Sequence, residues 1–434
     1  MYLGIDLGTT GLKCVMYEHD GTAAAEYNEE YPLIFIDSFV EQDADLWWAN
    51  LVSAVRALVE KTGRRDVVAL SISTQSISFV PVDKSGNTLY NSINWLDMRA
   101  SEECDAIEDE FGREKVFEKT GKPCDAAYSL PKMMWLKKHR KEVWDKAYKI
   151  LFPLDFLNMK LTGKFVTDYT VAGGTMLYNI KEKRWDEELL AFSGIDPEKL
   201  PEVAVMGTDL GTVLPSVADE MGISEDCRVI LGGQDQKIAA IGAGLEEGII
   251  TMSFGTASAL TKMGKEAFTE TGVPQFRFND EYFVSEAVAG TTGAALKWLS
   301  RMMGGVSYRE MDVLAEESSP GAGGVRAVTS FSEGATFSGM TLSTTKGDLI
   351  YALYEGTCRE IAERLREIGG ADEIRVFGGG SKSRIWCEIL ARITGCKISI
   401  LDTPETASRG AAILASGGAI APASCVGTID PADL

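Results

Sequence analysis

Two aspartates, Asp6 and Asp235, occupy places in the sequence where a carboxylate could act on a ligand. Asp6 ends an apolar, strand-like pattern and precedes the run Gly-Thr-Thr-Gly at residues 8–11. Glycines let the backbone turn tightly and approach a ligand, while threonine groups and the nearby Lys13 can donate to phosphate oxygens. A carboxylate beside phosphates repels them unless a cation lies between, so Asp6 suggests Mg²⁺ held through water. The alternative is an ordinary hairpin with a polar turn.

Asp235 follows the apolar run 228–231 and two glycines, and it stands at the start of an Ala-rich helical pattern. A helix N-terminus favours an ionised carboxylate. The plain interpretation is a helix N-cap. The chemical interpretation is a general base whose position is fixed between a rigid strand end and a rigid helix.

The small number of histidines limits the classes of enzyme to which the chain could belong. The chain has two histidines, His19 in a turn-like segment and His139 in a charged helix end. Neither lies near a candidate pocket, which argues against a Ser-His-Asp hydrolase and against a His-ligated zinc enzyme. Carboxylates, hydroxyls, backbone donors and a hard cation remain as the means of catalysis.

A second hairpin pattern repeats the first one. Residues 248–260 read as an apolar strand, a Gly255-Thr256 tip and another apolar strand. Two such hairpins, one near the start of each half, predict two related domains that face each other across a cleft. Glycines at 242–248 mark the boundary, so we expect domains at 1–245 and 246–434.

Other segments are placed to bind ligands. The buried-strand pattern 67–72 ends in polar residues 73–76, and open α/β sheets place ligands at such strand ends. Asp97 and Arg99 could pair with each other or bind polyol hydroxyls. A strand pattern at 374–377 ends in three glycines before a helical segment at 385–394, an arrangement typical of nucleotide binding. We also expect a helix over 44–61, capped by Asp43 or Asp45.

Composition favours a globular, two-domain protein. The chain has 434 residues, 45% apolar and 25% charged, and its formal net charge is 43 − 64 = −21. That charge argues against nucleic acid and against an anionic membrane surface as partners. From the residue pattern we expect no secretory leader and no membrane-spanning segment. The eight cysteines form no Cys-x-x-Cys pair, so we expect reduced thiols and a cytoplasmic protein.

In combination, these motifs resemble the FGGY family of carbohydrate kinases, and within it the xylulose kinases most, from residue 2 to about 416. The segments that carry the resemblance are the first hairpin at 6–13, Glu41-Gln-Asp43, Pro131-Lys132, Pro153-Leu-Asp155, Gly232-Gly-Gln-Asp-Gln236, Ser253-Phe-Gly-Thr256, 339–355 and Gly378-Gly-Gly-Ser381.

The resemblance implies an α/β fold of two actin-like (ribonuclease H-like) domains with an interdomain cleft, and MgATP-dependent phosphorylation of a small sugar or polyol. It implies Asp235 as the general base and Asp6 as the magnesium ligand. The residues expected to bind the nucleotide are Gly8, Thr9, Thr10, Lys13, Gly255, Thr256, Lys297, Gly378, Gly379, Gly380 and Ser383. The residues expected to bind the sugar are Gln75, Ser76, Ile77, Asp97, Asp235 and Gln236.

The chain departs from the family pattern on the sugar side. It has Gln-Ser-Ile-Ser at 75–78, where xylulose kinases usually carry Gln-Met-His-Gly and glycerol kinases carry Gln-Arg-Glu, and Ala257 replaces a usual serine. The resemblance implies a xylulose-like ketose as the leading substrate, and the departure keeps a sugar acid, ribulose or an alditol as alternatives. A catalytically inactive sugar or nucleotide sensor and a chaperone-type ATPase are the other hypotheses. Whether the protein forms a homodimer is left open.

Overall fold

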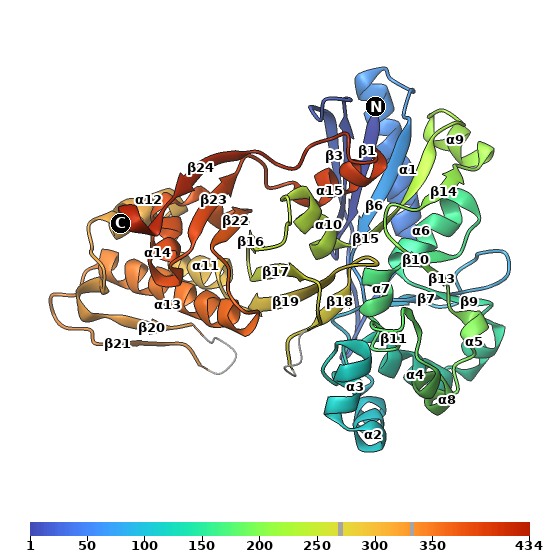
Figure 1. Cartoon of the computed structure of the whole chain (residues 1–434), viewed down its shortest axis with the longest axis horizontal. Coiled ribbons are helices and arrows are strands. Elements are labelled where there is room, and N and C mark those ends of the chain that lie inside the picture. The colour runs from blue at the N-terminus through green and yellow to red at the C-terminus, as the bar shows by residue number, and fades with distance from the viewer. Residues whose placement is uncertain (268–271, 330–333) are drawn as a thin grey trace. The chain divides into compact units, whose positions relative to one another are not determined.

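The chain folds into two compact α/β units. A computed structural model describes residues 1–267, 272–329 and 334–434 (Figure 1). The first unit comprises residues 1–242, 264–284 and 407–422, and the second comprises 243–263, 285–406 and 423–434.

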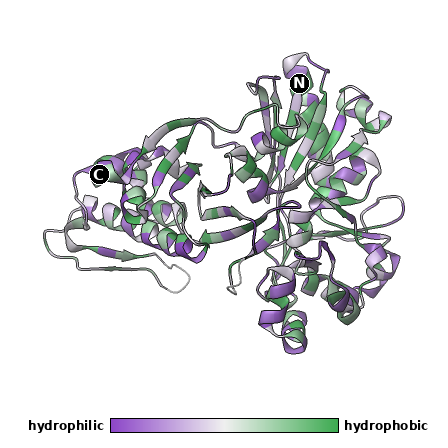
Figure 2. Ribbon diagram, viewed as in Figure 1, coloured by the Kyte–Doolittle hydropathy of each residue, from purple (hydrophilic) through white to green (hydrophobic). Residues whose placement is uncertain are grey.

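A six-stranded mixed sheet forms the centre of the first unit, in the order β14-β15-β6-β1-β2-β3. Its strands are β1 (Tyr2–Leu7), β2 (Gly11–Tyr17), β3 (Ala23–Glu30), β6 (Ala69–Thr74), β14 (Asp209–Thr212) and β15 (Arg228–Gln234). Strands β15, β6 and β1 run parallel, while β2, β3 and β14 join in antiparallel fashion. Every residue of β6 is buried, as expected for a parallel strand covered on both faces. Apolar residues colour much of these strands green in Figure 2.

Short strands and helices surround this sheet. The remaining strands of the first unit are β4 (Ile34–Ile36), β5 (Phe39–Gln42), β7 (Val80–Val82), β8 (Ser92–Ile93), β9 (Lys149–Leu151), β10 (Val166–Asp168), β11 (Tyr178–Asn179), β12 (Arg184–Trp185), β13 (Glu202–Ala204) and β18 (Gln275–Arg277). Its helices are α1 (Ala44–Thr62), α2 (Ser101–Phe111), α3 (Arg113–Thr120), α4 (Ser129–His139), α5 (Lys141–Lys146), α6 (Pro153–Thr162), α7 (Tyr169–Gly173), α8 (Glu187–Ser193), α9 (Pro215–Met221), α10 (Asp235–Gly242), α15 (Thr406–Ala415) and the 3₁₀ turn η1 (Pro197–Lys199).

Helix α1 shows how the sequence determines these elements. Asp43 is its N-cap, and the side chain accepts a hydrogen bond from the backbone of Asp45. The helix ends at Gly63, whose φ of 67° lies in the left-handed region. Trp47 is fully buried in the core, where its ring packs edge-on against Phe156. The predicted helix and one of its two predicted caps are thus observed.

The second unit repeats the pattern of the first. Its strands β19-β17-β16-β22-β23-β24 lie in that order, with β16, β22 and β23 parallel and β16-β17 forming a hairpin. The strands are β16 (Ile249–Phe254), β17 (Ser258–Gly264), β19 (Phe283–Ala289), β20 (Arg326–Val328), β21 (Thr336–Ser338), β22 (Glu373–Phe377), β23 (Lys397–Leu401) and β24 (Cys425–Ile429). The helices are α11 (Gly293–Met302), α12 (Tyr308–Glu316), α13 (Lys346–Glu367) and α14 (Arg384–Thr394), with 3₁₀ turns η2 (Ala322–Gly324), η3 (Gly380–Lys382) and η4 (Pro431–Asp433). Each unit therefore has a hairpin followed by two further parallel strands and an antiparallel edge strand.

Helix α15 packs with the first unit, although it lies near the end of the chain. The reason is two close backbone approaches that only glycine permits. A Cβ on Gly4 of β1 would lie 1.9 Å from the carbonyl oxygen of Ser408, and one on Gly410 would lie 1.9 Å from that of Ile238 in α10. The units are thus not two continuous stretches, and the predicted single boundary at 245/246 stays a prediction.

We expect Gly4→Ala to destabilise the protein by about 1–3 kcal/mol or more, because the added methyl group must push α15 away from β1. Gly173→Ala is the matched control in the same unit, since its Cβ would meet the ring of Phe276 at an ordinary 3.4 Å. The midpoints of thermal unfolding compare the two variants. Equal midpoints for the two variants would show that the packing of α15 against β1 does not depend on the close backbone approach at Gly4.

Candidate functional site

Three parallel strands of the first unit end at one edge of the sheet and bring the candidate side chains there. In the register of the sheet, Asp6 of β1 is level with Ser73 of β6, and Gly233 of β15 is level with the same serine. Gln75 and Asp235 follow β6 and β15 directly. The carboxyl edge of parallel strands is where open α/β sheets bind ligands.

Asp6 lies at this edge with its side chain half-buried. Its Oδ1 accepts a hydrogen bond of 2.7 Å from the hydroxyl of Ser73. Within the described part of the chain, no three or more His, Cys, Asp or Glu side chains gather as a metal cage. Mg²⁺ is commonly held by one or two carboxylates together with waters and substrate phosphates, and a single carboxylate at a strand end fits that mode.

Asp235 is the first residue of α10, directly after the end of β15. Its Oδ1 accepts hydrogen bonds from the backbone N–H of Gln236, at 2.7 Å, and from the side-chain amide of Gln234. These donors stabilise the ionised form and fix its orientation. Gly232 permits this placement, because a Cβ there would lie 1.7 Å from the carbonyl oxygen of Ile72. Gln236 is half-buried beside the carboxylate.

The hairpin tip between β1 and β2 is held tightly. Gly8 donates to the carbonyl of Gly11 at 2.9 Å, which closes the turn. The carbonyl of Thr9 accepts from the side chain of Gln42 at 2.6 Å, and its hydroxyl accepts from the indole N–H of Trp95 at 2.9 Å. The tip thus has a fixed shape before any ligand arrives.

Of the other two candidate phosphate ligands of this hairpin, Thr10 lies in the tip and Lys13 lies in β2. Thr10 is exposed, and its carbonyl accepts a backbone hydrogen bond from Tyr31 at 3.0 Å. Lys13 is the cross-strand partner of Asp6 and forms an ion pair of 3.3 Å with Glu26. A cation next to Asp6 on the adjacent strand suits a site for anionic oxygens.

A buried group of three amides links the predicted sugar residue Gln75 to the hairpin tip. Gln42 Oε1 accepts from Gln75 at 2.8 Å and from Asn94 at 2.7 Å, while its amide donates to Thr9. The ammonium of Lys132 donates to the carbonyl of Asn94 at 2.9 Å. Burial lowers the pKa of Lys132 to about 7, against the opposing effect of a nearby carboxylate. Sequence analysis did not assign Gln42 or Asn94 to the site.

Asp97 and Arg99 pair with each other, the first of the two alternatives. Arg99 donates to both oxygens of Asp97, at 2.8 and 2.7 Å, and to Glu41 at 2.9 Å. The three side chains are 0–1% exposed, and the guanidinium lies over the rings of Phe39 and Trp135. A direct sugar contact by Asp97 stays a prediction.

The segment after β6 has an unusual backbone. Ile77 has a φ of 73°, a conformation that a β-branched residue rarely adopts. The carbonyl of Ile77 accepts from the hydroxyl of Ser129 at 2.6 Å, and Ser78 accepts from the backbone of Trp95 at 3.0 Å. Ser76 is buried beside them. Such strain commonly marks a functional segment, and the sequence pattern alone gave no sign of it.

The second unit contains a pocket of 830 Å³ lined by most of the nucleotide-binding residues that the sequence predicts for this unit. Those residues are Gly255, Thr256, Lys297, Gly379, Gly380 and Ser383. The N-terminus of α11 rests on the tip of the β16-β17 hairpin, where Gly293 donates to Gly255 and Ala294 to Thr256. Gly378, with a φ of 98°, lets the strand end approach Phe254.

One wall of this pocket comes from residues that sequence analysis missed. The carboxylate of Asp312 in α12 accepts hydrogen bonds of 2.7 Å from the hydroxyls of Ser383 and Tyr354. The ring of Tyr354 stacks on that of Trp386 with centroids 4.7 Å apart. Arg301 and Arg309 also line the pocket. These residues sit on four helices, α11 to α14, so only the fold brings them together.

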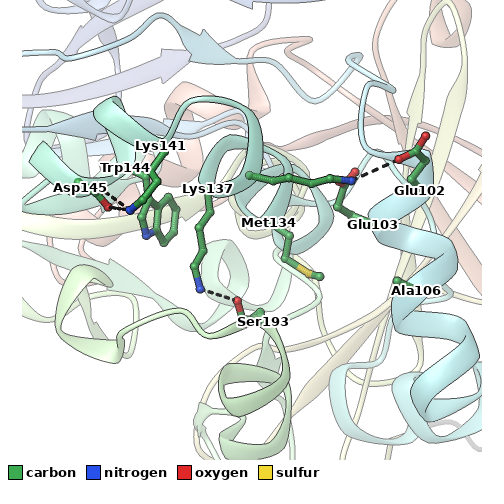
Figure 3. A pocket seen from close by; sticks show the side chains of 10 residues that line it. Glu102, Glu103, Ala106, Met134, Lys137, Lys141, Trp144, Asp145 and Ser193 are labelled. Atoms are coloured by element: carbon green, nitrogen blue, oxygen red, sulfur yellow. Dashed lines mark hydrogen bonds and ion pairs between the residues drawn. The ribbon is translucent and has the colours of Figure 1, made fainter.

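A second pocket, of 530 Å³, lies in the first unit and is lined by residues of α2, α4 and α5 and by Ser193 at the end of α8 (Figure 3). Its lysines are engaged within the protein: Lys138 pairs with Glu102, Lys141 pairs with Asp145, and Lys137 donates to the carbonyl of Ser193. The three lysines of this pocket therefore already have partners within the protein.

The fold is that of known sugar kinases. The chain matches the crystal structure of ligand-bound xylulose kinase from Lactobacillus acidophilus with a TM-score of 0.92 at 23% identity, over 99% of this chain and 93% of that one. The predicted architecture of two actin-like α/β domains is confirmed.

Two family models match the chain: FGGY family of carbohydrate kinases, N-terminal domain, over residues 1–242, and the C-terminal domain of the same family over residues 250–419. The chain therefore belongs to the FGGY family of carbohydrate kinases, and the predicted class, an ATP-dependent sugar kinase, is confirmed.

Characterised relatives have different substrates in their names. The chain is 26% identical to the xylulose kinase of Staphylococcus xylosus (96% of this chain, 90% of the relative) and 28% identical to that of Bacillus subtilis (96% and 88%). It is 25% identical to the gluconokinase of Bacillus subtilis (95% and 86%). Among residues 1–267, 272–329 and 334–434, no helix is both long and apolar enough to cross a bilayer.

Proposed function

We propose that this kinase transfers the terminal phosphate of ATP to a hydroxyl of a xylulose-like ketose, with Asp235 as the general base. The observation that carries the proposal is the register of β1, β6 and β15, which places Asp6, Gln75 and Asp235 at one strand edge. Phosphoryl transfer depends mainly on positioning and on neutralising charge, and this edge offers both.

Asp235 takes the proton of the attacking hydroxyl. Its carboxylate is oriented by two hydrogen bonds at Oδ1, so it can accept a proton without first changing its rotamer. Gln75, Ser76, Ile77, Asp97 and Gln236 are the proposed sugar-binding residues, and the amides around Gln75 suit hydroxyl groups as donors and acceptors.

Each unit has its own proposed nucleotide-binding residues. The pocket of the second unit takes the nucleoside and the inner phosphates, with Lys297 and the glycines at 378–380 as ligands. In the first unit, the residues at the tip of the first hairpin and Lys13 are the proposed phosphate-binding residues. Asp6 would hold Mg²⁺, which neutralises charge on the phosphate oxygens when it is bound.

The relatives include xylulose kinases and a gluconokinase. Their names support a short, open-chain, hydroxyl-rich substrate for this chain. We favour the ketose because more of the relatives named above are xylulose kinases. A sugar acid is the second candidate, since a relative of similar identity is a gluconokinase. ATP and phosphorylated sugars are intracellular metabolites, so we propose a cytoplasmic enzyme; a homodimer stays a prediction.

A coupled assay with MgATP over ketoses, aldonates and alditols tests the proposal. We expect the highest kcat/KM with a ketose of the xylulose type. A clear preference for gluconate would replace the ketose with the second candidate. Ligand binding without any phosphorylated product across the panel would favour the sensor hypothesis.

Lys297 provides a test of the nucleotide pocket. We expect Lys297→Ala to raise the KM for ATP by roughly 10- to 100-fold, because a charge-assisted hydrogen bond to phosphate is lost. The KM for the sugar should stay within about twofold, since the predicted sugar residues belong to the first unit. Lys346→Ala, an exposed lysine of the same unit outside the pocket, is the control. An equal KM for ATP in both variants would remove Lys297 from the site.

A further inference from the structure

Asp168 lies next to the end of β15, the strand that directly precedes Asp235. It is the last residue of β10 and the N-cap of α7, and its side chain is fully buried. Its Oδ1 accepts a hydrogen bond of 2.9 Å from the backbone N–H of Val171, and its Oδ2 accepts from both the N–H and the hydroxyl of Thr170, each at 2.7 Å. The carboxylate thereby fixes the first turn of α7.

The hydroxyl of Thr170 connects this carboxylate to β15. It donates to Asp168 and accepts a hydrogen bond of 2.9 Å from the backbone N–H of Gln234. A backbone N–H can only donate, and an ionised carboxylate can only accept, so the direction of both hydrogen bonds is determined. We call the three linked groups, the Asp168 carboxylate, the Thr170 hydroxyl and the Gln234 N–H, the Asp168 relay.

Gly233 makes the relay possible. A Cβ at this position would lie 2.9 Å from the hydroxyl oxygen of Thr170 and 3.1 Å from Oδ2 of Asp168. Only a residue without a side chain lets β15 approach the buried pair this closely. Gly233 and Gln234 are the two residues that immediately precede Asp235, so the relay acts on the backbone that aims the carboxylate.

The relay is buried and well supplied with donors. All of its side-chain atoms are buried, and burial raises the pKa of Asp168 to about 6 although three donors oppose the rise. The carboxylate is therefore mostly ionised at neutral pH and keeps its role as acceptor.

We propose that Asp168 and Thr170 are positioning residues for phosphoryl transfer, which fix the end of β15 and thereby the direction of the Asp235 carboxylate. The inference rests on the proposed function, since it takes Asp235 as the general base. In this structure both residues are buried and satisfied by protein groups, so they act on the rate through placement of another residue and not through contact with substrate.

Thr170→Val keeps the shape of the side chain and removes the hydroxyl. We expect kcat to fall roughly 10- to 100-fold, because small displacements of a catalytic group cost this much, while the KM values for ATP and sugar stay within about twofold. Thr170→Ser restores the hydroxyl and should bring kcat back to within about threefold of the wild type. A purely structural role would not separate kcat from KM in this way.

Thr175→Val is the matched control. Thr175 is also buried, and its hydroxyl also both donates and accepts. It donates to the carbonyl of Ala172 at 2.6 Å, where Thr170 donates to a carboxylate, and it accepts from the backbone N–H of Leu177 at 3.1 Å. Neither partner belongs to β15. We expect its kcat to match the wild type, and an equal loss in both variants would overturn the inference. Asp168→Asn is the second variant should Thr170→Val fail to fold, with the same expected loss of kcat.

A double variant with Asp235→Asn separates the inference from the proposed function. If the relay acts through Asp235, Thr170→Val should have almost no further effect in the Asp235→Asn background, whereas independent losses that multiply would overturn the relay. Full turnover of Asp235→Asn alone would refute the base and, with it, the relay. A slow Asp235→Asn enzyme together with an unimpaired, folded Thr170→Val enzyme would refute the relay and leave the base in place.

Discussion

Asp235→Asn should lower kcat by about 10²- to 10⁴-fold, the range expected when a positioned general base is lost. The substitution keeps the size of the side chain and replaces a proton acceptor with a neutral amide. The strand end and α10 should stay in place, because a carboxamide oxygen can still accept from the backbone N–H of Gln236. The loss is therefore expected in turnover and not in folding.

Nucleotide binding should survive this substitution. The pocket lined by Lys297 and Ser383 belongs to the second unit, whereas Asp235 belongs to the first. Calorimetric titration with MgADP should give the wild-type affinity within about threefold. Asp209→Asn, which changes an exposed carboxylate of the edge strand β14, is the matched control and should turn over normally. Turnover of Asp235→Asn within a factor of about two of the wild type would rule out the role of base.

The predictable part of this protein is the part encoded by short-range patterns. The strand, glycine and threonine order around Asp6 recurs around Thr256, and both predicted hairpins are observed. The helix expected over 44–61 is α1, which occupies Ala44–Thr62. Alternating apolar residues and glycines at turns act within a few residues, so they can be read from the sequence without knowledge of the fold.

Long-range contacts are the part that sequence patterns do not reveal. Gln42 and Asn94 reach the candidate sugar site because β5 and the segment after β8 pack beside the end of β6. Asp312 contributes to the candidate nucleotide pocket from a helix that has no motif of its own. The return of α15 to the first unit depends on close approaches at Gly4 and Gly410. A single glycine in a strand or helix does not show which backbone will lie against it.

Arg99→Met should reduce the free energy of unfolding by about 3–5 kcal/mol, because it leaves two buried carboxylates without their cation. Arg99 bonds Asp97 through two nitrogens and also reaches Glu41, and none of the three side chains is more than 1% exposed. Methionine retains much of the apolar contact with the ring of Phe39. The loss therefore reports on uncompensated charge more than on an emptied cavity.

The exposed pair of Arg64 with Asp66 supplies the control. Arg64 also bonds one carboxylate through two nitrogens, at 2.7 Å each, but the two side chains are 42% and 58% exposed. Water can replace the lost partner there, so Arg64→Met should hardly move the midpoint of urea unfolding. Comparable midpoints for the two variants would contradict the assignment of a buried ion-pair cluster at Arg99.

The same substitutions separate the two interpretations of Asp97. If Asp97 serves mainly as the partner of Arg99, the triple variant Arg99→Met, Asp97→Asn, Glu41→Gln should recover part of the lost stability, because no buried charge remains unpaired. Its KM for the sugar should then stay near that of the wild type. If Asp97 binds the sugar directly, the triple variant should regain stability and yet show a KM for the sugar raised by roughly tenfold or more, as expected when a hydrogen bond to a charged group is lost. Unfolding curves and sugar kinetics on one set of proteins therefore distinguish a residue that holds the segment in place from one that touches the substrate.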